Sequence, residues 1–216
     1  KIEIIGEESI TPEAVKMSLP AYYVLSCAEA SSNLARYDGL RYGMSSKEST
    51  AMDTGSITSS REEQYSLTRS IGFGSEVQRR ILAGAAVLSS DRFHSHYEAA
   101  TKIRATITKQ FDRVFGGTSS DNAIDLILIP TALTDPPDLS PESPTPDNTE
   151  AFQNDIMTVP ISLAGLPSVS VPVLVDATDD HDGEYSHPVV GMQIFGPKLS
   201  EKLIFRAAHA LRDLST

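Results

Sequence analysis

SVSVPVLV, residues 168–175, is predicted to be a β-strand. Pro172 has no backbone N–H to offer a neighbour, so this strand belongs at the edge of a sheet or at a bulge. PVVGMQIF (188–195) is expected to pair with it through a polar connection. AIDLILIP (123–130) is short and fully apolar, which is typical of a strand covered on both faces in an α/β protein.

Helices are predicted before these strands. Thr11-Pro12-Glu13 supplies a capping hydroxyl, a first-turn proline and an early acid, so a helix should begin there and run to about residue 35, bent at Pro20. A weakly patterned helix is expected over 61–70. Apolar residues recur at three- and four-residue steps over 75–89 and 91–115, which predicts two amphipathic helices. Their apolar faces comprise Val77, Ile81, Leu82, Ala85 and Leu88, then Phe93, Tyr97, Ala100, Ile107, Phe111 and Val114.

The remaining segments complete the predicted order. Residues 2–5 are expected to form a strand, 150–158 a short helix, and Ser200 and Glu201 to open a last helix. Residues 38–60 are expected to be irregular, and the Pro-rich stretch 134–149 to be a surface loop. Helices first, then strands alternating with helices, favour a mixed α/β layer with helices packed on a sheet. The face expected to be apolar in the last helix is Leu203, Ala207, Ala210 and Leu214.

Composition narrows the classes of function. With 216 residues, 40% of them hydrophobic, the chain can bury the core of one domain. Its formal charge of −11 makes it a poor main platform for nucleic acid. A single cysteine, Cys27, excludes an internal disulfide and suits a reducing compartment. No apolar run approaches the ~18–20 residues that a membrane-spanning helix needs.

EASSNLARYDGLRYG (29–43) is the least generic stretch of the sequence. Its small residues permit another backbone to approach closely, and polar residues then gather around two glycines. Two interpretations stay open: a functional site, or a structural helix exit in which Arg and Asp side chains satisfy backbone carbonyl and N–H groups. The small residues are Ala30, Ser31 and Ser32, and the polar set is Asn33, Arg36, Tyr37, Asp38, Arg41 and Tyr42.

Other candidate groups favour ordinary structural roles. Ser45-Ser46-Lys47 lies in a polar loop, where a solvated lysine would stay protonated and could not activate serine. The acidic segment 176–187 lacks the fixed ligand frame of a calcium loop, so a solvated loop is expected and no metal is predicted. His94 and His96 fall on different sides of a helix, and His209 needs no special role. No P-loop, GxGxxG, paired-cysteine zinc pattern or GxSxG elbow occurs, and no complete nucleophile, base and orienter can be identified.

Four stretches together resemble the A-subunit family of the glutamyl-tRNA(Gln) amidotransferases, within the wider amidase-signature group. They occur in the family's order and span nearly the whole chain. LAGLPSVSVP and GMQIFG recur across the wider group, whereas EASSNLARYDGLRYG narrows the match to the amidotransferase family. The stretches are LPAYYVLSCAEASSNLARYDGLRYG (19–43), GFGSEVQRRILAGAAVLSS (72–90), NDIMTVPISLAGLPSVSVPV (154–173) and VVGMQIFGPKLSEKLIFRAAHAL (189–211).

The resemblance implies an amidase-signature fold, a mixed β-sheet covered by helices, of which residues 1–216 would be the C-terminal half of a single domain. In that family a serine, a second serine on a cis peptide and a lysine perform the chemistry, in a Gly/Ser-rich signature that this sequence does not contain. We therefore expect the catalytic triad to lie outside this chain. None of Ser26, Ser31, Ser32 or Lys47 is expected to replace it.

This part of the family fold is expected to recognise L-glutamine. The resemblance assigns Arg80 to the substrate carboxylate, Asp155 to the α-amino group, and Tyr22 (or its neighbour Tyr23) to the pocket wall. A zwitterion does require a cation and an anion of this kind. The alternative is that Arg80 and Asp155 form a structural ion pair.

The implied reaction is hydrolysis of glutamine through an acyl-enzyme. The ammonia would pass to the amidotransferase's B subunit, which uses ATP and Mg to amidate Glu-tRNA(Gln) and makes most of the tRNA contact. A small accessory subunit is a further expected partner, and no cofactor is expected in the present chain. Another amidase-signature hydrolase, or a non-catalytic interaction fragment, remain alternatives.

The Pro-rich segment and the acidic segment favour a mitochondrial, fungal-like form in the matrix, with the cytoplasm of a bacterium as the other expectation.

Overall fold

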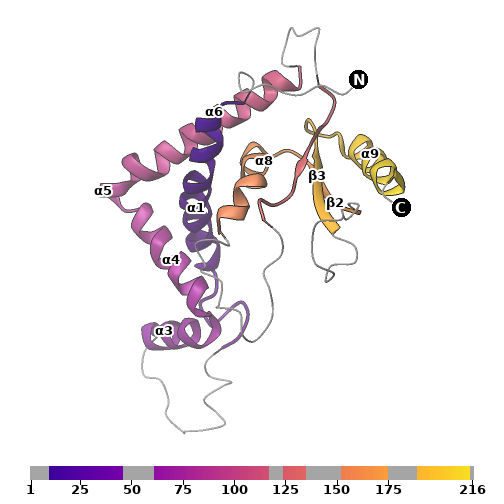
Figure 1. The fold of residues 1–216 in the computed structure, drawn as a ribbon. Helices are drawn as coiled ribbons and strands as arrows, with labels where there is room; N and C mark the ends of the chain where they lie inside the picture. Colours follow the sequence, from indigo (N-terminus) through magenta and orange to yellow (C-terminus); the bar gives the residue numbers. More distant parts are fainter. Residues whose placement is uncertain (1–9, 46–60, 117–123, 135–151, 175–188, 215–216) are drawn as a thin grey trace, which may run out of the picture. The chain divides into compact units, whose positions relative to one another are not determined.

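The computed structural model describes residues 10–45, 61–116, 124–134, 152–174 and 189–214 (Figure 1). The chain divides into two compact units, Lys1–Pro20 with Lys102–Thr216 and Ala21–Thr101. The fold class is mixed α/β, as predicted, with more helix than strand among the described residues.

The first unit contains a three-stranded antiparallel sheet. Strands β1 (Ile127–Pro130), β3 (Val189–Phe195) and β2 (Ser168–Leu174) lie in the order β1-β3-β2. Phe195 of the central strand faces Ile127 on one side and Ser168 on the other. The predicted pairing of the two C-terminal strands is confirmed, and Pro172 lies in an edge strand as expected.

The expectation that residues 123–130 are covered on both faces is wrong for the part of them that forms β1. Among the described strands β1 is the other edge strand, and Leu128 keeps 49% of its surface exposed. Only alternate residues of a strand face a given core, so an all-apolar run does not by itself show burial of both faces. Ile127 is the residue of this strand that enters the core.

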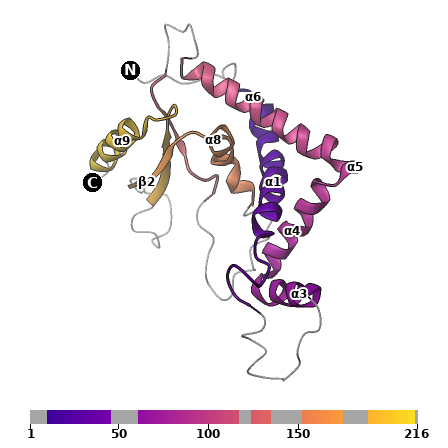
Figure 2. The same cartoon turned by 180° about the vertical axis from the view of Figure 1, so that it is seen from behind.

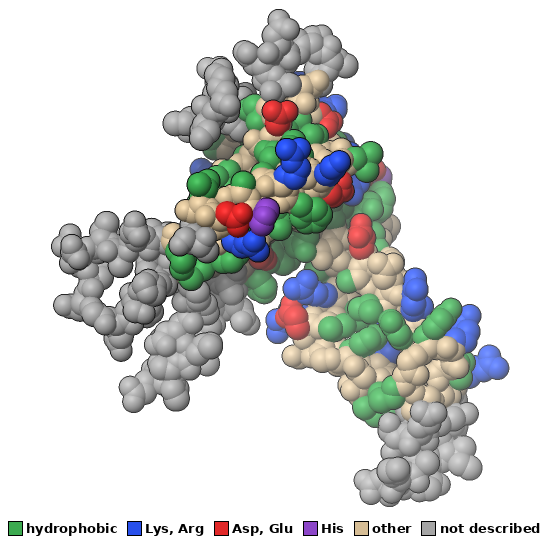
Figure 3. All heavy atoms as spheres, turned by 90° about the vertical axis from the view of Figure 1, so that its right-hand side faces the viewer, with side chains coloured by type: hydrophobic (Ala, Val, Ile, Leu, Met, Phe, Trp, Pro, Cys, Tyr) green, Lys and Arg blue, Asp and Glu red, His purple; other side chains and the backbone are tan. Residues whose placement is uncertain are grey.

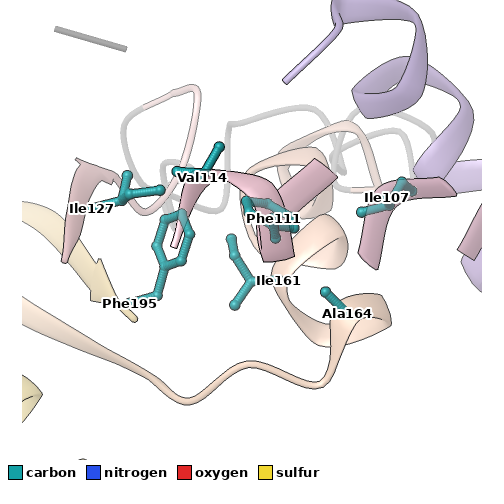
Figure 4. Packing of buried hydrophobic residues seen from close by; sticks show 7 residues of the cluster. All are labelled: Ile107, Phe111, Val114, Ile127, Ile161, Ala164 and Phe195. Carbon is teal, nitrogen blue, oxygen red and sulfur yellow. The ribbon is translucent and has the colours of Figure 1, made fainter. Parts of the chain in front are cut away.

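Helices cover the two faces of this sheet, and α8 and α9 lie on opposite sides of it in both views (Figures 1 and 2). Figure 4 shows side chains of α6 (Glu98–Val114) and α8 (Val159–Ala164) meeting the strands in one cluster. The ring of Phe195 meets Phe111 edge-on at 5.7 Å. Burying an aromatic side chain of this size stabilises the fold by about 1.5–3 kcal/mol. The cluster comprises Ile107, Phe111, Val114, Ile127, Ile161, Ala164 and Phe195.

The face predicted for the last helix is shifted. Helix α9 (Glu201–Leu214) exists as expected, but it buries Ile204 against Val171 and Ile194 of the sheet. Ala207, Ala208 and Leu211 complete that face, whereas Leu203 and Leu214 are exposed. The apolar residues of this helix populate two adjacent faces, and the sequence pattern alone could not say which one meets the sheet.

The second unit is helical. It holds the end of α1 (Pro12–Leu34), then α3 (Arg61–Gly72), α4 (Ser75–Val87), α5 (Ser90–Arg92) and a π-helical turn, η1 (Phe93–Tyr97). The helix predicted from Thr11 to about residue 35 is confirmed, with Pro20 inside it.

The single helix predicted over 91–115 is wrong in its first part. The Glu98 N–H donates to the Phe93 carbonyl five residues back, which widens the helix there. The rings of Phe93 and Tyr97 stack at 5.2 Å across this turn. A four-residue apolar spacing fits both kinds of turn, so the sequence pattern does not reveal the π-helix.

The predicted apolar face of α4 is also only partly right. Val77 and Ile81 are half-buried, but Leu82 is 72% exposed and Ala85 is exposed as well. The buried residue is Gly84. A glycine adds nothing to an apolar pattern, yet it lets two backbones meet.

Several predictions fall outside the described residues: the strand at 2–5, nearly all of the Pro-rich loop 134–149, residues 46–60 and the acidic segment 176–187. In the part of the chain that is described, no helix is long and apolar enough to cross a membrane.

Candidate functional site

Arg80 lies on α4 beside the second half of α1. A Cβ built on Gly84 would come 2.0 Å from the Cys27 carbonyl oxygen and 2.8 Å from the Ser31 Cβ. The two helices therefore touch through their backbones, one turn from Arg80. Because Ser31 belongs to the small-residue end of α1, the predicted close approach of another backbone is confirmed.

Solvent exposure distinguishes Arg80 from Arg79. Both contact the Glu76 carboxylate, Arg80 Nε at 3.1 Å and Arg79 Nη1 at 2.6 Å. The side chain of Arg80 is 32% exposed and that of Arg79 is 68% exposed. Among the described residues of its own unit, Arg80 thus pairs with a half-exposed carboxylate one turn away.

The charges of Arg80 and Glu76 affect the pKa of Cys27. Burial raises the pKa of the Cys27 thiol; the Arg80 guanidinium acts in the lowering direction and the Glu76 carboxylate in the raising direction. The thiol is therefore mostly protonated at neutral pH, and it lies within electrostatic range of Arg80.

At the helix exit, residues 34–41, Asp and Arg side chains bond to backbone groups. Asp38 Oδ1 accepts hydrogen bonds from the N–H groups of Leu40 and Arg41, and these bonds lower the pKa of Asp38 to about 2. Arg69 of α3 donates to the carbonyl oxygens of Leu34 and Tyr37. These side chains satisfy backbone groups, as one of the two open interpretations expected.

Tyr22 and Tyr23 lie on α1 in the same unit as Arg80. Both rings are half-buried, and they meet edge-on with centroids 5.4 Å apart. The choice between them as the pocket tyrosine stays a prediction.

Asp155 lies in the other unit, where it opens the short 3-10 helix η2 (Asp155–Met157) just before α8. Its carbonyl oxygen accepts from both the N–H and the Oγ1 of Thr158. Asn154, immediately before it, accepts from the Leu133 N–H and donates to Thr134 Oγ1, both at 3.0 Å. That Asp155 shares a pocket with Arg80 and Tyr22 also stays a prediction.

Gln193 holds the other end of this turn. It lies in the central strand β3, only 3% exposed, and its Nε2 donates to the Met157 carbonyl at 3.1 Å. Sequence reasoning assigned no role to Gln193 or Asn154. A lone amide inside the apolar stretch GMQIF was the signal that could have found Gln193, since a buried polar group needs a partner.

A pocket of about 250 Å³ lies on α3 and α4 but does not include Arg80 among its lining residues. The Arg69 guanidinium at its wall lies 4.9 Å from the ring centroids of both Tyr65 and Phe73. Arg69 also donates hydrogen bonds to the backbone carbonyls of Leu34 and Tyr37, so its role is structural. We therefore interpret this pocket as the junction between α3 and α4. Its lining is Tyr65, Ser66, Arg69, Ser70, Phe73, Gln78, Ile81 and Leu82.

The three described histidines make local contacts. His94 pairs with Glu98, His96 Nδ1 lies 2.8 Å from Ser95 Oγ, and His209 contacts Asp213. Within the described ranges, no group of three or more His, Cys, Asp or Glu residues could hold a metal ion. Of the Ser45-Ser46-Lys47 group only Ser45 is described; Gln64 Nε2 donates to its hydroxyl at 3.4 Å. On the face drawn in Figure 3, basic and acidic side chains are interspersed with apolar ones.

Comparisons with known proteins find an amidase family model and amidotransferase A subunits. The model of the family described as Amidase matches residues 5–205. The A subunit of glutamyl-tRNA(Gln) amidotransferase from Bartonella quintana is 39% identical over 92% of this chain and 35% of that protein. The protein of the same name from Staphylococcus carnosus is 36% identical over 96% of this chain and 39% of that protein.

A solved structure, that of the A subunit of the same amidotransferase from Thermotoga maritima, has a TM-score of 0.46 and 31% sequence identity. The match covers 71% of the present chain and 30% of the Thermotoga maritima chain. The present chain thus spans little more than a third of the length of the curated relatives compared.

Proposed function

This chain belongs to the amidase family, and on that premise we propose that it is part of the glutamine-hydrolysing subunit of a tRNA-dependent amidotransferase. Within that subunit its role is to recognise glutamine. The names of the relatives support the enzyme class. The resemblance of the QRRIL and QNDIM stretches to the family supports the assignment of Arg80 and Asp155.

The observation that carries the proposal is the contrast between two adjacent arginines. Arg79 and Arg80 share one acidic partner, yet Arg80 is the less exposed by a factor of about two. A shielded guanidinium binds a carboxylate more strongly than a solvated one, because water competes less and the local dielectric is lower. Its partner Glu76 is half-exposed, so a substrate carboxylate can displace or share it.

The chemistry then divides between parts of the protein. Arg80 binds the α-carboxylate of glutamine, Asp155 binds the α-ammonium group, and Tyr22 lines the pocket. The side-chain amide is thereby presented to a serine in the Gly/Ser-rich signature of the family, which forms the acyl-enzyme and releases ammonia. A partner subunit, with ATP and Mg, uses the ammonia to amidate Glu-tRNA(Gln), while a small accessory subunit joins the assembly.

The acidic balance of this chain is consistent with tRNA being bound mainly by the partner. A mitochondrial compartment stays a prediction from the Pro-rich and acidic segments; the relatives compared are bacterial.

The test is glutamine hydrolysis by the complete protein, assembled with its partners, in matched variants. Arg80→Ala should lower kcat/KM for glutamine about 100-fold, as expected when one partner of a shielded charge pair is removed. Arg79→Ala removes the same chemical group from the next residue and should change it less than about threefold. If both variants hydrolyse glutamine like the unmodified protein, the site assignment fails, and another amide becomes the better candidate substrate.

A further inference from the structure

The turn that carries Asp155 is held from outside at both of its ends. Before it, the Asn154 amide bridges to the chain that leaves β1, through the Leu133 N–H and Thr134 Oγ1. After it, Gln193 reaches from β3 to the Met157 carbonyl. Two amide side chains therefore tie the ends of this turn to the chain that follows β1 and to strand β3.

We propose that Asn154 and Gln193 are positioning residues that hold Asp155 for the α-ammonium group of an amino-acid amide and so set selectivity for that ligand. This inference rests on the proposed function, because it takes Asp155 as the ammonium-binding residue. Neither amide contacts the ligand; each acts through the backbone of the turn.

The turn needs such support because of its own chemistry. A 3-10 helix has poorer hydrogen-bond geometry than an α-helix, and the three residues of η2 join the helical residues 152–154 to the turn before α8. An aspartate side chain is short, so the place of its carboxylate follows the backbone closely. A displacement of about 1 Å is enough to weaken a charged contact or misorient a substrate severely.

Amides suit this task better than charged residues. Asn154 and Gln193 can each donate and accept hydrogen bonds without adding charge. Neither one therefore competes with a ligand ammonium group for the Asp155 carboxylate. Gln193 is nearly fully buried, so its bond to Met157 is shielded from water and costly to leave unmade.

The experiment uses the complete, assembled protein and two substrates: glutamine and glutaramate, which is glutamine without its α-amino group. Asn154→Ala should raise KM for glutamine about tenfold, leave kcat within about twofold, and leave KM for glutaramate unchanged. In an Asp155→Ala background the same change should add nothing. Gln153→Ala, an exposed amide one residue away, is the matched control.

The outcomes distinguish failure of the positioning role from failure of the proposed function. If Asp155→Ala raises KM for glutamine and Asn154→Ala does not, the positioning role is wrong and the proposed function stands. An equal loss on glutamine and glutaramate would show a general structural role and would also overturn the inference. If Asp155→Ala itself leaves KM for glutamine unchanged, the ammonium site is misassigned and the inference fails with it.

Discussion

The region around Arg80 and the region around Asp155 hold their charged side chains in different ways. Arg80 stands on a regular helix that is fixed by backbone contact at Gly84, and its long side chain is steadied by Glu76 alone among the charged groups of its helix. Asp155 has a short side chain on a three-residue turn, and two amides fix the backbone of that turn. Rigidity comes from helix packing in one region and from side-chain clamps in the other. Changes to α4 packing should therefore act mainly on stability, whereas changes near Asp155 should act on ligand selectivity and, less strongly, on stability.

The largest effect is expected at the helix contact. Gly84→Ala places a Cβ against the Cys27 carbonyl, where only a backbone shift can relieve the clash. We expect a loss of about 3 kcal/mol in the free energy of unfolding, measured by urea denaturation of the complete protein. Gly74→Ala makes the same change in open space at the N-cap of α4 and should cost less than about 1 kcal/mol. Equal losses in the two variants would remove the case for a backbone contact.

A smaller effect on stability is expected at the Asp155 turn. Gln193→Met keeps the approximate volume but leaves the Met157 carbonyl without its donor. The expected loss is about 1–2 kcal/mol in the free energy of unfolding, with a higher KM for glutamine. Gln153→Met, the same change at an exposed site, should stay within about 0.5 kcal/mol. A neutral result at Gln193 would mean that the turn holds its shape without the clamp.

Cys27 gives a probe of the charge on Arg80 that does not depend on substrate. Arg80→Met keeps a long side chain but removes the positive charge that lowers the Cys27 pKa, so that pKa should rise. Alkylation of Cys27 by iodoacetamide, followed against pH, should shift to higher pH, and Glu76→Gln should shift it the other way. Arg79→Met is the control and should leave the profile in place. An unchanged profile for Arg80→Met would contradict the placement of Arg80 beside α1.

The smallest effect on stability is expected at Asp38. Its carboxylate, which binds the N–H groups of Leu40 and Arg41, titrates with pH, whereas the amides of Asn154 and Gln193 do not. The folded-state pKa of about 2 lies below the ordinary value of about 3.9, so Asp38 contributes stability above pH 4 that is lost as pH falls through 2. The difference in Tm between the unmodified protein and Asp38→Asn should shrink over that range. A difference that stays constant from pH 5 to pH 2 would count against the clamp.

The sequence predicted the elements better than their contacts. Pro172 correctly indicated an edge strand, and the start of α1 follows from Thr11 and Pro12, because these signals are local. The apolar faces of α4 and α9 were partly missed, since each helix offers more than one apolar stripe and only the tertiary contact selects one.

The candidate site divides in the same way. The predictions for Arg80 and Asp155 come from the positions of these residues in the QRRIL and QNDIM stretches that resemble the family, and they stay predictions. Asn154 and Gln193 were assigned no role. The amide of Gln193 within an apolar stretch indicates that a partner exists, but that partner is the Met157 carbonyl, and Asn154 bonds the Leu133 N–H; a sequence pattern does not identify such backbone partners.

In the proposed function, glutamine is recognised through opposite charges on Arg80 and Asp155. The most direct measurement is kcat/KM of the complete protein for 4-aminobutanamide, which is glutamine without its carboxylate, beside glutamine itself. Arg80→Ala should lower the value for glutamine about 100-fold and leave that for 4-aminobutanamide within about twofold. If Arg80→Ala lowers both values equally, or neither, Arg80 does not bind the substrate carboxylate.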